Sequence, residues 1–174
     1  KGRMRAFIVL AALLAAAACM PAAAATPKVA ETAGLRTVAL KANGSVWHLG
    51  GNGETPTPLL VGNLANVVDI SGRYAVKSDG TVWDIGEARV LDRPVQVPGL
   101  SSVVAIATGA QHYLVLKSDG SVWAGGDNQM GQLGNGSTVS EVLPIDVPGL
   151  TSGVTAISTG AYHTCALASS GAVK

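Results

Sequence analysis

The stretch HYLVLKSDGSVWAGGDNQMGQLGNG, residues 112–136, decides the fold of this chain. Two short apolar segments in it flank Ser-Asp-Gly-Ser at residues 118–121. Asp-Gly between apolar runs is the strongest short-range hairpin signal, because a type I′ turn needs positive φ at both central residues. The pattern predicts a hairpin with a two-residue turn, in which Leu116 lies opposite Trp123 on one face. The glycine-dense GQLGNG that follows cannot be a helix interior.

Weaker copies of this unit lie before and after it. The turn dipeptides are Asn43-Gly44, Asp79-Gly80, Asp119-Gly120 and Ser170-Gly171, at spacings of 36, 40 and 51 residues. A valine lies two residues beyond each glycine, and tryptophan follows that valine in the first three copies. Apolar residues alternate before each turn, as expected of a strand. The repetition indicates a protein built from similar β-units.

Each unit carries the signals for about four short strands. In the best copy we expect one strand ending at Ile106 and others at 112–117, 121–125 and 144–147, with Pro144 on an edge strand. Four-stranded units repeating at about 40–50 residues are typical of a β-propeller, and an open sandwich is the alternative. The predicted fold is all-β, a partial β-propeller of about three four-stranded blades over residues 34–174, and the chain reads as a fragment of a longer protein.

The N-terminus has the pattern of a secretory signal peptide. Met4-Arg5 precedes about thirteen uncharged residues, and Ala23-Ala24-Ala25 follows Pro21. Residues 1–25 are therefore predicted to be an extension plus a signal peptide cleaved near Ala25-Thr26, and 26–33 a linker. The apolar run is too short to span a bilayer comfortably. The mature protein is expected to be secreted or periplasmic.

The chain has two cysteines, and neither indicates chemistry. Cys19 follows three alanines in a faint likeness to a lipoprotein box, but the usual leucine is missing, so we favour a small apolar leader residue over a lipid anchor. Cys165 takes the place of Leu114 in its copy, which predicts a buried apolar thiol. Without the leader no internal disulfide can form.

Charge argues against nucleic acid as a partner. The formal charge of +1 includes three basic residues of the N-terminal extension, and the remainder carries about −2. The other Lys and Arg residues are scattered singly. Nucleic-acid binding draws on clustered cations that release counterions from phosphate.

Nothing in the sequence argues for a catalytic, cofactor or metal site. His112 and His163 recur at one repeat position, but no Cys, Asp or Glu cluster accompanies them at metal spacing. A structural role is favoured, with the ring hydrogen-bonded to backbone at a strand start. The glycines of GQLGNG are not followed by the Gly-Lys-Ser/Thr of a phosphate-binding loop, and no serine sits in a nucleophile elbow.

The longest loop, residues 126–143, is the candidate binding element. Loops held by a rigid scaffold are where binding residues concentrate. Four of its residues do not recur in the other copies and could contact a protein, namely Asp127, Asn128, Gln129 and Met130. An ordinary solvated loop is the alternative.

The repeat resembles that of the regulator of chromosome condensation family. The resemblance is carried by Gly109-Ala110-Gln111-His112, Leu116-Lys117-Ser118-Asp119-Gly120, Val122-Trp123, Gly126-Asp127-Asn128 and Gly131-Gln132-Leu133-Gly134. It covers roughly residues 34–174, and its motifs are most complete in the third copy. The first two copies depart from the pattern: Arg36 and Gly72 replace the histidine, and GQLG is reduced to GGNG in the first copy and absent from the second.

The resemblance implies a non-enzymatic scaffold that recognises another protein, here an exported one that binds a protein or a surface polymer. The best-known member is a nuclear guanine-nucleotide exchange factor, and the leader and the charge argue against transferring that role. A β-lactamase-inhibitor-like regulator is a second possibility, and a propeller enzyme acting on glycans a third. No cofactor is expected.

Overall fold

The structure is a computed structural model and describes residues 27–32, 36–49, 58–86 and 94–174. Within these ranges every element of regular structure is a β-strand. Three sheets have four antiparallel strands and a fourth sheet has two. The predicted all-β, partial propeller with about three four-stranded blades is confirmed.

Each sheet follows the chain order from its inner to its outer strand. Sheet A contains β1 (Lys28–Thr32), β2 (Arg36–Leu40), β3 (Val46–Leu49) and β4 (Leu59–Leu60). Sheet B contains β5 (Val67–Ser71), β6 (Tyr74–Lys77), β7 (Val82–Asp84) and β8 (Val95–Gln96). Sheet C contains β9 (Val103–Thr108), β10 (His112–Lys117), β11 (Val122–Gly126) and β12 (Glu141–Asp146). Sheet D contains β13 (Val154–Thr159) and β14 (Thr164–Ala168).

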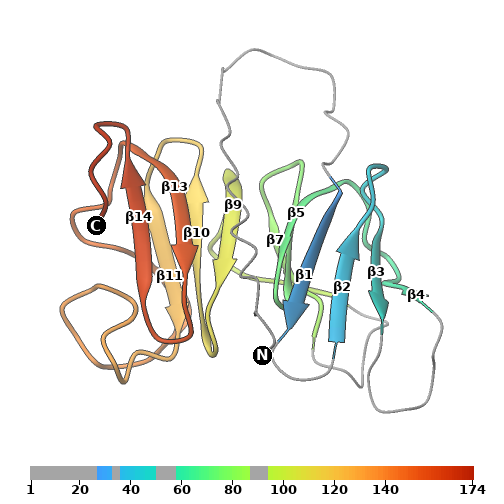
Figure 1. The fold of residues 1–174 in the computed structure, drawn as a ribbon, viewed down its shortest axis with the longest axis horizontal. Helices are drawn as coiled ribbons and strands as arrows, with labels where there is room; N and C mark the ends of the chain where they lie inside the picture. The colour runs from blue at the N-terminus through green and yellow to red at the C-terminus, as the bar shows by residue number, and fades with distance from the viewer. Residues whose placement is uncertain (1–26, 33–35, 50–57, 87–93) are drawn as a thin grey trace, which may run out of the picture.

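The sheets stand side by side in an arc, in chain order (Figure 1). The first strand of each sheet lies against the first strand of the next: β1 contacts β5, β5 contacts β9, and β9 contacts β13. The last strands, β4, β8 and β12, form the outer edges. Pro144 lies in β12, on an edge as predicted, where a missing N–H removes no ladder bond.

Residues 28–32, predicted to be part of a linker, form β1 instead. All five pair with β2 in antiparallel register. The sequence pattern did not predict this strand, because the strand is short, has only valine and alanine as apolar residues, and directly follows the leader. The leader itself lies outside the described residues.

The hairpin turn of the deciding stretch is one residue longer than predicted. Lys117 accepts a hydrogen bond from Gly120 N and donates one to Ser121 O, each 2.9 Å long. Only the glycine has positive φ, at 80°. This is a three-residue loop, a type I turn closed by a left-handed glycine, and not a type I′ turn. The extra residue shifts the register, so Val115 and not Leu116 lies opposite Trp123.

The turn side chains repeat the same small network in three copies. Asp119 Oδ1 accepts hydrogen bonds from Ser121 N at 2.9 Å and Ser121 Oγ at 2.6 Å. Asn43 and Asp79 do the same toward the residue two positions on. The hydroxyl hydrogen bond is the largest cause that holds the pKa of Asp79 and of Asp119 below the ordinary value. These acidic residues are explained by their turns.

The same turns join each sheet to the next. The carbonyl of the turn glycine accepts a hydrogen bond from the first valine of the following sheet, at 3.3 Å for Gly44 and 3.1 Å for Gly80 and Gly120. The fit is tight, because a Cβ on Gly120 would lie 2.7 Å from Gly153 N. Glycine is thus required here twice, for its conformation and for the approach of the next sheet.

Apolar side chains fill the spaces between neighbouring sheets. One buried cluster lies between sheets A and B, a second between B and C, and a third between C and D. Both faces of sheets B and C are therefore buried. Trp83 packs against the first cluster and Trp123 against the second.

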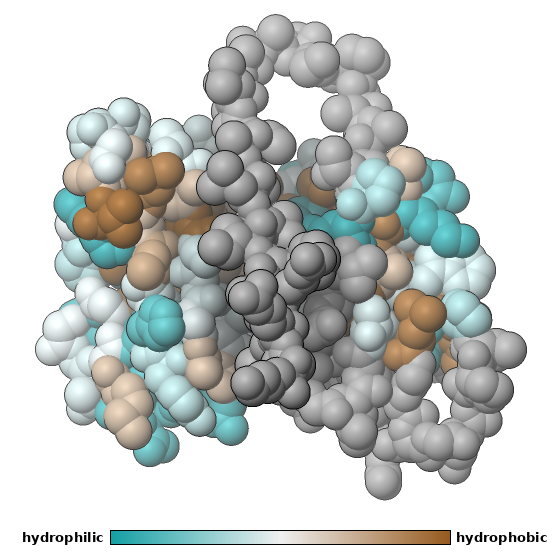
Figure 2. Space-filling model, in the orientation of Figure 1, coloured by the Kyte–Doolittle hydropathy of each residue, from teal (hydrophilic) through white to brown (hydrophobic). Residues whose placement is uncertain are grey.

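Sheet D is covered on one face only. Figure 2 shows apolar residues gathered at the end of the molecule that β13 and β14 form. Leu167 and Val173 are exposed, and Cys165 is exposed as well. The prediction of a buried thiol is therefore wrong for the described chain: Ala166 faces sheet C, while its neighbours Cys165 and Leu167 point away from it.

Candidate functional site

The loop between β11 and β12 is folded around one buried side chain, that of Asn128. None of its surface is accessible to solvent. Its Oδ1 accepts a hydrogen bond from Leu133 N at 2.9 Å. Its Nδ2 lies 3.0 Å from three acceptors across the loop, Asn135 Oδ1, Ser137 O and Val139 O. A single amide therefore holds both sides of the loop together.

Asp127 and Gln132 close the base of the same loop. Gln132 Nε2 donates to Asp127 Oδ2 at 2.9 Å, and Ser140 Oγ donates to Asp127 Oδ1 at 3.0 Å. Gln132 Oε1 accepts from Met130 N at 2.9 Å. Burial alone would raise the pKa of Asp127, but the hydrogen bonds from Ser140 and Gln132 outweigh it and leave that pKa below the ordinary value. The carboxylate is a structural acceptor inside the loop.

The four predicted contact residues thus divide into two kinds. Asn128 is buried and Asp127 is engaged inside the loop, so the prediction of a contact role is withdrawn for Asn128, whose polar atoms are all directed inward. Gln129 and Met130 are exposed, with Met130 73% accessible. All four residues were candidates because of their types and position, and neither tells which side of the loop a side chain faces. Only the structure separates the two pairs.

Further exposed apolar side chains lie on the returning side of the loop and on the outer strand. Val139 is 66% accessible, Val142 96% and Leu143 59%. Asn128 donates a hydrogen bond to Val139 O, and Asp127 accepts one from Ser140 Oγ. These bonds hold residues 139–140 beside residues 127–128, which directly precede Gln129 and Met130. Exposed apolar groups on an ordered edge are typical of contact surfaces. The sequence pattern placed Val142 and Leu143 in the loop 126–143 without singling them out, whereas the structure places both in β12.

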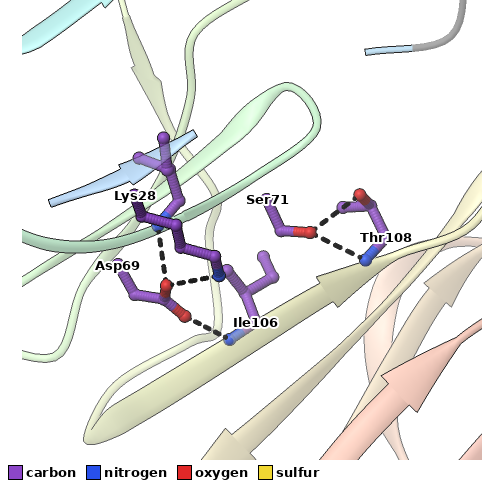
Figure 3. A network of polar contacts seen from close by, with 6 residues as sticks. Lys28, Asp69, Ser71, Ile106 and Thr108 are labelled. Carbon is purple, nitrogen blue, oxygen red and sulfur yellow. Dashed lines mark hydrogen bonds and ion pairs between the residues drawn. The ribbon is translucent and has the colours of Figure 1, made fainter. Parts of the chain in front are cut away.

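A second polar group ties the inner strands together (Figure 3). Asp69 of β5 accepts from Lys28 Nζ of β1 at 2.7 Å and from Ile106 N of β9 at 3.2 Å. Ser71 Oγ lies 3.0 Å from Thr108 Oγ1 and accepts from Thr108 N at 3.1 Å. Each contact crosses from one sheet to the next, so this network fastens sheets and offers no unpaired group. An acidic residue in the otherwise apolar VVDI was the available signal.

The histidines lie where the repeat predicts but are bonded differently. His112 begins β10, and the residue is 3% accessible. Neither of its ring nitrogens has a hydrogen-bond partner among the described residues, so the predicted ring-to-backbone bond is wrong for His112. The ring instead packs on Gly109, where an added Cβ would lie 2.1 Å from Cε1. His163 repeats this contact with Gly160 but is exposed.

We expect His112 to make the fold sensitive to mild acid. Burial is the largest cause that lowers the pKa of its imidazole; Asp127 raises that pKa and His163 lowers it. Below the ordinary value of 6.5 the unfolded chain binds a proton that the folded chain does not, so stability falls with falling pH. Asp79, Asp119 and Asp127, whose pKa values are lowered, lose their contribution to folding stability only as the pH falls below about 3.8.

The check is urea unfolding of the wild type and His112→Phe between pH 7 and pH 5. The wild type should lose stability across this window, and His112→Phe should lose clearly less. His163→Gln is the matched control: its ring is exposed, and it removes only the last of the three causes that act on the pKa of His112, so this variant should keep most of the wild-type slope. An unchanged slope in His112→Phe would contradict the assignment.

The described ranges contain no group of three or more His, Cys, Asp or Glu side chains that could hold a metal ion. No helix in those same ranges is long and apolar enough to cross a membrane.

Sequence profiles of one family match part of the chain. Two profiles described as the regulator of chromosome condensation (RCC1) repeat match residues 119–167 and residues 103–132. The matches cover sheet C, its long loop and sheet D, where the motifs are most complete.

Solved structures of the same kind match most of the chain. The crystal structure of human WBSCR16 has a TM-score of 0.67 at 24% identity, covering 86% of this chain and 47% of that one. Yeast RCC1 (Prp20) bound to Kap60 has a TM-score of 0.66 at 23% identity, covering 83% and 42%. Prp20p from Saccharomyces cerevisiae, described with its binding to Gsp1p and histones, has a TM-score of 0.66 at 18% identity, covering 84% and 44%.

The chain thus spans less than half the length of these solved chains. At such identities the likeness concerns the fold. Residues 103–167 are similar to RCC1 repeats, and the described chain folds as part of an RCC1 propeller.

Proposed function

We propose that this protein is an exported, non-enzymatic scaffold that binds another protein through the loop and edge strand at residues 129–143. The proposal rests on one observation: some residues of the loop fix its shape, and others are exposed to solvent. Asp127, Asn128 and Gln132 fix its shape by hydrogen bonds, while Gln129 and Met130 are presented to solvent. A surface whose shape is fixed beforehand loses little conformational entropy on binding.

The chemistry of this surface suits a protein partner. It combines a flexible methionine with valine and leucine on a strand whose outer edge is free within the described chain. Methionine adapts its shape to apolar surfaces, and an edge strand offers backbone hydrogen bonds to an incoming segment. Yeast RCC1, which shares this fold, has been seen bound to a protein, Kap60, and this precedent supports protein recognition.

Export rests on the leader alone. The pattern of residues 1–25 supports a signal peptide, and N-terminal sequencing of the mature protein tests it directly. A mature chain that begins near Thr26 is the expected result, and a mature chain that retains Met4 would overturn it.

Site-specific photo-crosslinking tests the binding surface. A photoreactive residue at Gln129 should give a discrete adduct with one protein in cells that express the chain. The same residue at Thr151, which is exposed in the connection between sheets C and D, is the matched control. Adducts of equal yield from both positions, or none from position 129, would count against the proposal.

A further inference from the structure

Sheet C has the longest outer strand of the described sheets. β12 has six residues, whereas β4 and β8 have two each. It pairs with β11 on one side only, so its other edge is open within the described chain. β4 and β8 are outer strands in the same way, so an open outer edge is a property of each four-stranded sheet and does not depend on the sheet that follows.

The side chains of β12 combine exposed apolar groups with acidic groups. Val142 and Leu143 are exposed. Glu141 begins the strand and Asp146 ends it, and the first is partly exposed and the second fully so. Five residues of extended strand separate the two carboxylates by about 17 Å. The open edge is therefore an apolar stretch with a negative charge at each end.

These two carboxylates differ from the others that the structure describes. Neither Glu141 nor Asp146 has a hydrogen-bond or ion-pair partner for its side chain among the described residues. Lys117, whose ammonium lies over Trp123 of the neighbouring β11, forms an ion pair with neither. The remaining described carboxylates are all bound: Asp69 to Lys28, Asp79 to Thr81, Asp84 to Arg73, Asp119 to Ser121 and Asp127 to Gln132. The structure thus leaves free only the acidic groups of the outer strand.

The surrounding segment supplies no cation that could neutralise this edge. Residues 118–173, which include β12 and the whole loop before it, contain no lysine or arginine. Complementary charge sets the register of a partner and rejects like-charged ones. An open strand edge also pairs with the backbone of an extended polypeptide. Charge and backbone together favour a basic, extended partner.

We propose that β12 binds an extended polypeptide segment that carries lysine or arginine residues about five positions apart, with apolar residues between them. The inference rests on the proposed scaffold function and names the chemistry of the partner. The cations lie against Glu141 and Asp146, and the apolar side chains lie against Val142 and Leu143. Charge alone also suits a free polyamine, but the exposed valine and leucine favour a polypeptide.

The test is a titration of the full chain with fluorescein-labelled KVTVTK, with EVTVTE as the charge-reversed control and KSTSTK as the control without valine. KVTVTK should bind at least about tenfold more tightly than EVTVTE, because attraction replaces repulsion at both ends. It should also bind more tightly than KSTSTK and weaken as salt is added, since the charges are exposed. No binding of KVTVTK, or equally tight binding of either control, would overturn the proposal. Equally tight binding of spermidine would overturn the polypeptide source.

Variants of β12 test whether the peptide binds on this strand. Glu141→Gln combined with Asp146→Asn should weaken binding of KVTVTK about threefold or more, as expected for two exposed ion pairs. Val142→Ser should weaken it about fivefold through lost apolar burial. Val95→Ser on β8 is the matched control for Val142→Ser, because Val95 is also exposed on an outer strand, and should bind as the wild type does.

Unchanged binding by either β12 variant, with an unchanged melting temperature, would refute the assignment to this strand. The substituted side chains are exposed or partly exposed, so the variants should fold as the wild type does. A photo-adduct from position 129 in a chain that does not bind KVTVTK would leave the scaffold function standing and overturn only the basic chemistry assigned to the partner.

Discussion

Replacing Gly120 by alanine is expected to lower the free energy of unfolding by about 3 kcal/mol, from left-handed backbone strain and a lost joint between sheets. The φ of Gly120 is 80°, a region that alanine adopts at a cost. The new Cβ would lie 2.7 Å from Gly153 N, and the bond from Val154 N to Gly120 O, 3.1 Å long, would have to open. Urea unfolding followed by tryptophan fluorescence measures the change.

Gly171→Ala is the control that separates the two causes. Gly171 holds the same turn position with φ of 84°, but no atom lies within 4 Å of its added Cβ. The free energy of unfolding of Gly171→Ala should therefore fall only by the cost of backbone strain, about 1 kcal/mol. If both variants lost equal stability, the joint between sheets C and D would contribute nothing.

Asn128→Leu should be comparably destabilising, by about 3 kcal/mol, because it leaves buried backbone groups of the loop without partners. The substitution keeps approximately the volume and removes the acceptor of Leu133 N and the donor to Ser137 O and Val139 O. We expect the loop to open first, so hydrogen exchange at the Leu133 amide should accelerate by more than the global change alone explains.

Gln129→Ala is the neighbouring control. Its side chain is exposed, so its effect on stability should stay within about 0.5 kcal/mol. A similar loss in the two variants would show that the asparagine does not organise the loop. These measurements do not depend on knowing the binding partner.

The repeated sequence pattern predicted the fold because every copy carries the same local signals. A turn glycine, alternating apolar residues and a following Val-Trp specify a hairpin at each repeat, and their regular spacing predicts blades. In sheet C the bounds of β10 and β11 agree with the predicted strands to within one residue, while β9 ends two residues later and β12 begins three residues earlier than predicted. What failed was the turn type, since Asp-Gly suits both a two-residue and a three-residue loop, and Lys117–Ser121 pairing selects the longer one.

Contacts between sheets were beyond the reach of the sequence. The hydrogen bond from Val154 N to Gly120 O joins residues far apart in the chain, and neither residue type predicts it. The same holds for Lys28 and Asp69, which meet only because β1 and β5 are neighbours in the arc. Cys165 was assigned to the core by its repeat position, yet exposure depends on whether another sheet covers that face.

The sequence proposes a candidate loop but does not separate its buried residues from its exposed ones. The non-recurring residues after Gly126 are the reason why the sequence singles out this loop, and its role in binding stays a prediction. An amide such as that of Asn128 serves equally as a loop organiser or a contact, and burial alone distinguishes them. Val142 and Leu143 were assigned to the loop, but β12 begins at Glu141 and presents both side chains to solvent.

The central claim is that recurring and hydrogen-bonded residues build the propeller while exposed residues of the loop bind a protein. The most direct measurement is the yield of the photo-adduct from position 129 after Met130→Lys, read together with the melting temperature. A charge at this exposed side chain should leave the melting temperature within about 1 °C and reduce the adduct at least about tenfold. An undiminished adduct from a chain of unchanged stability would contradict the claim.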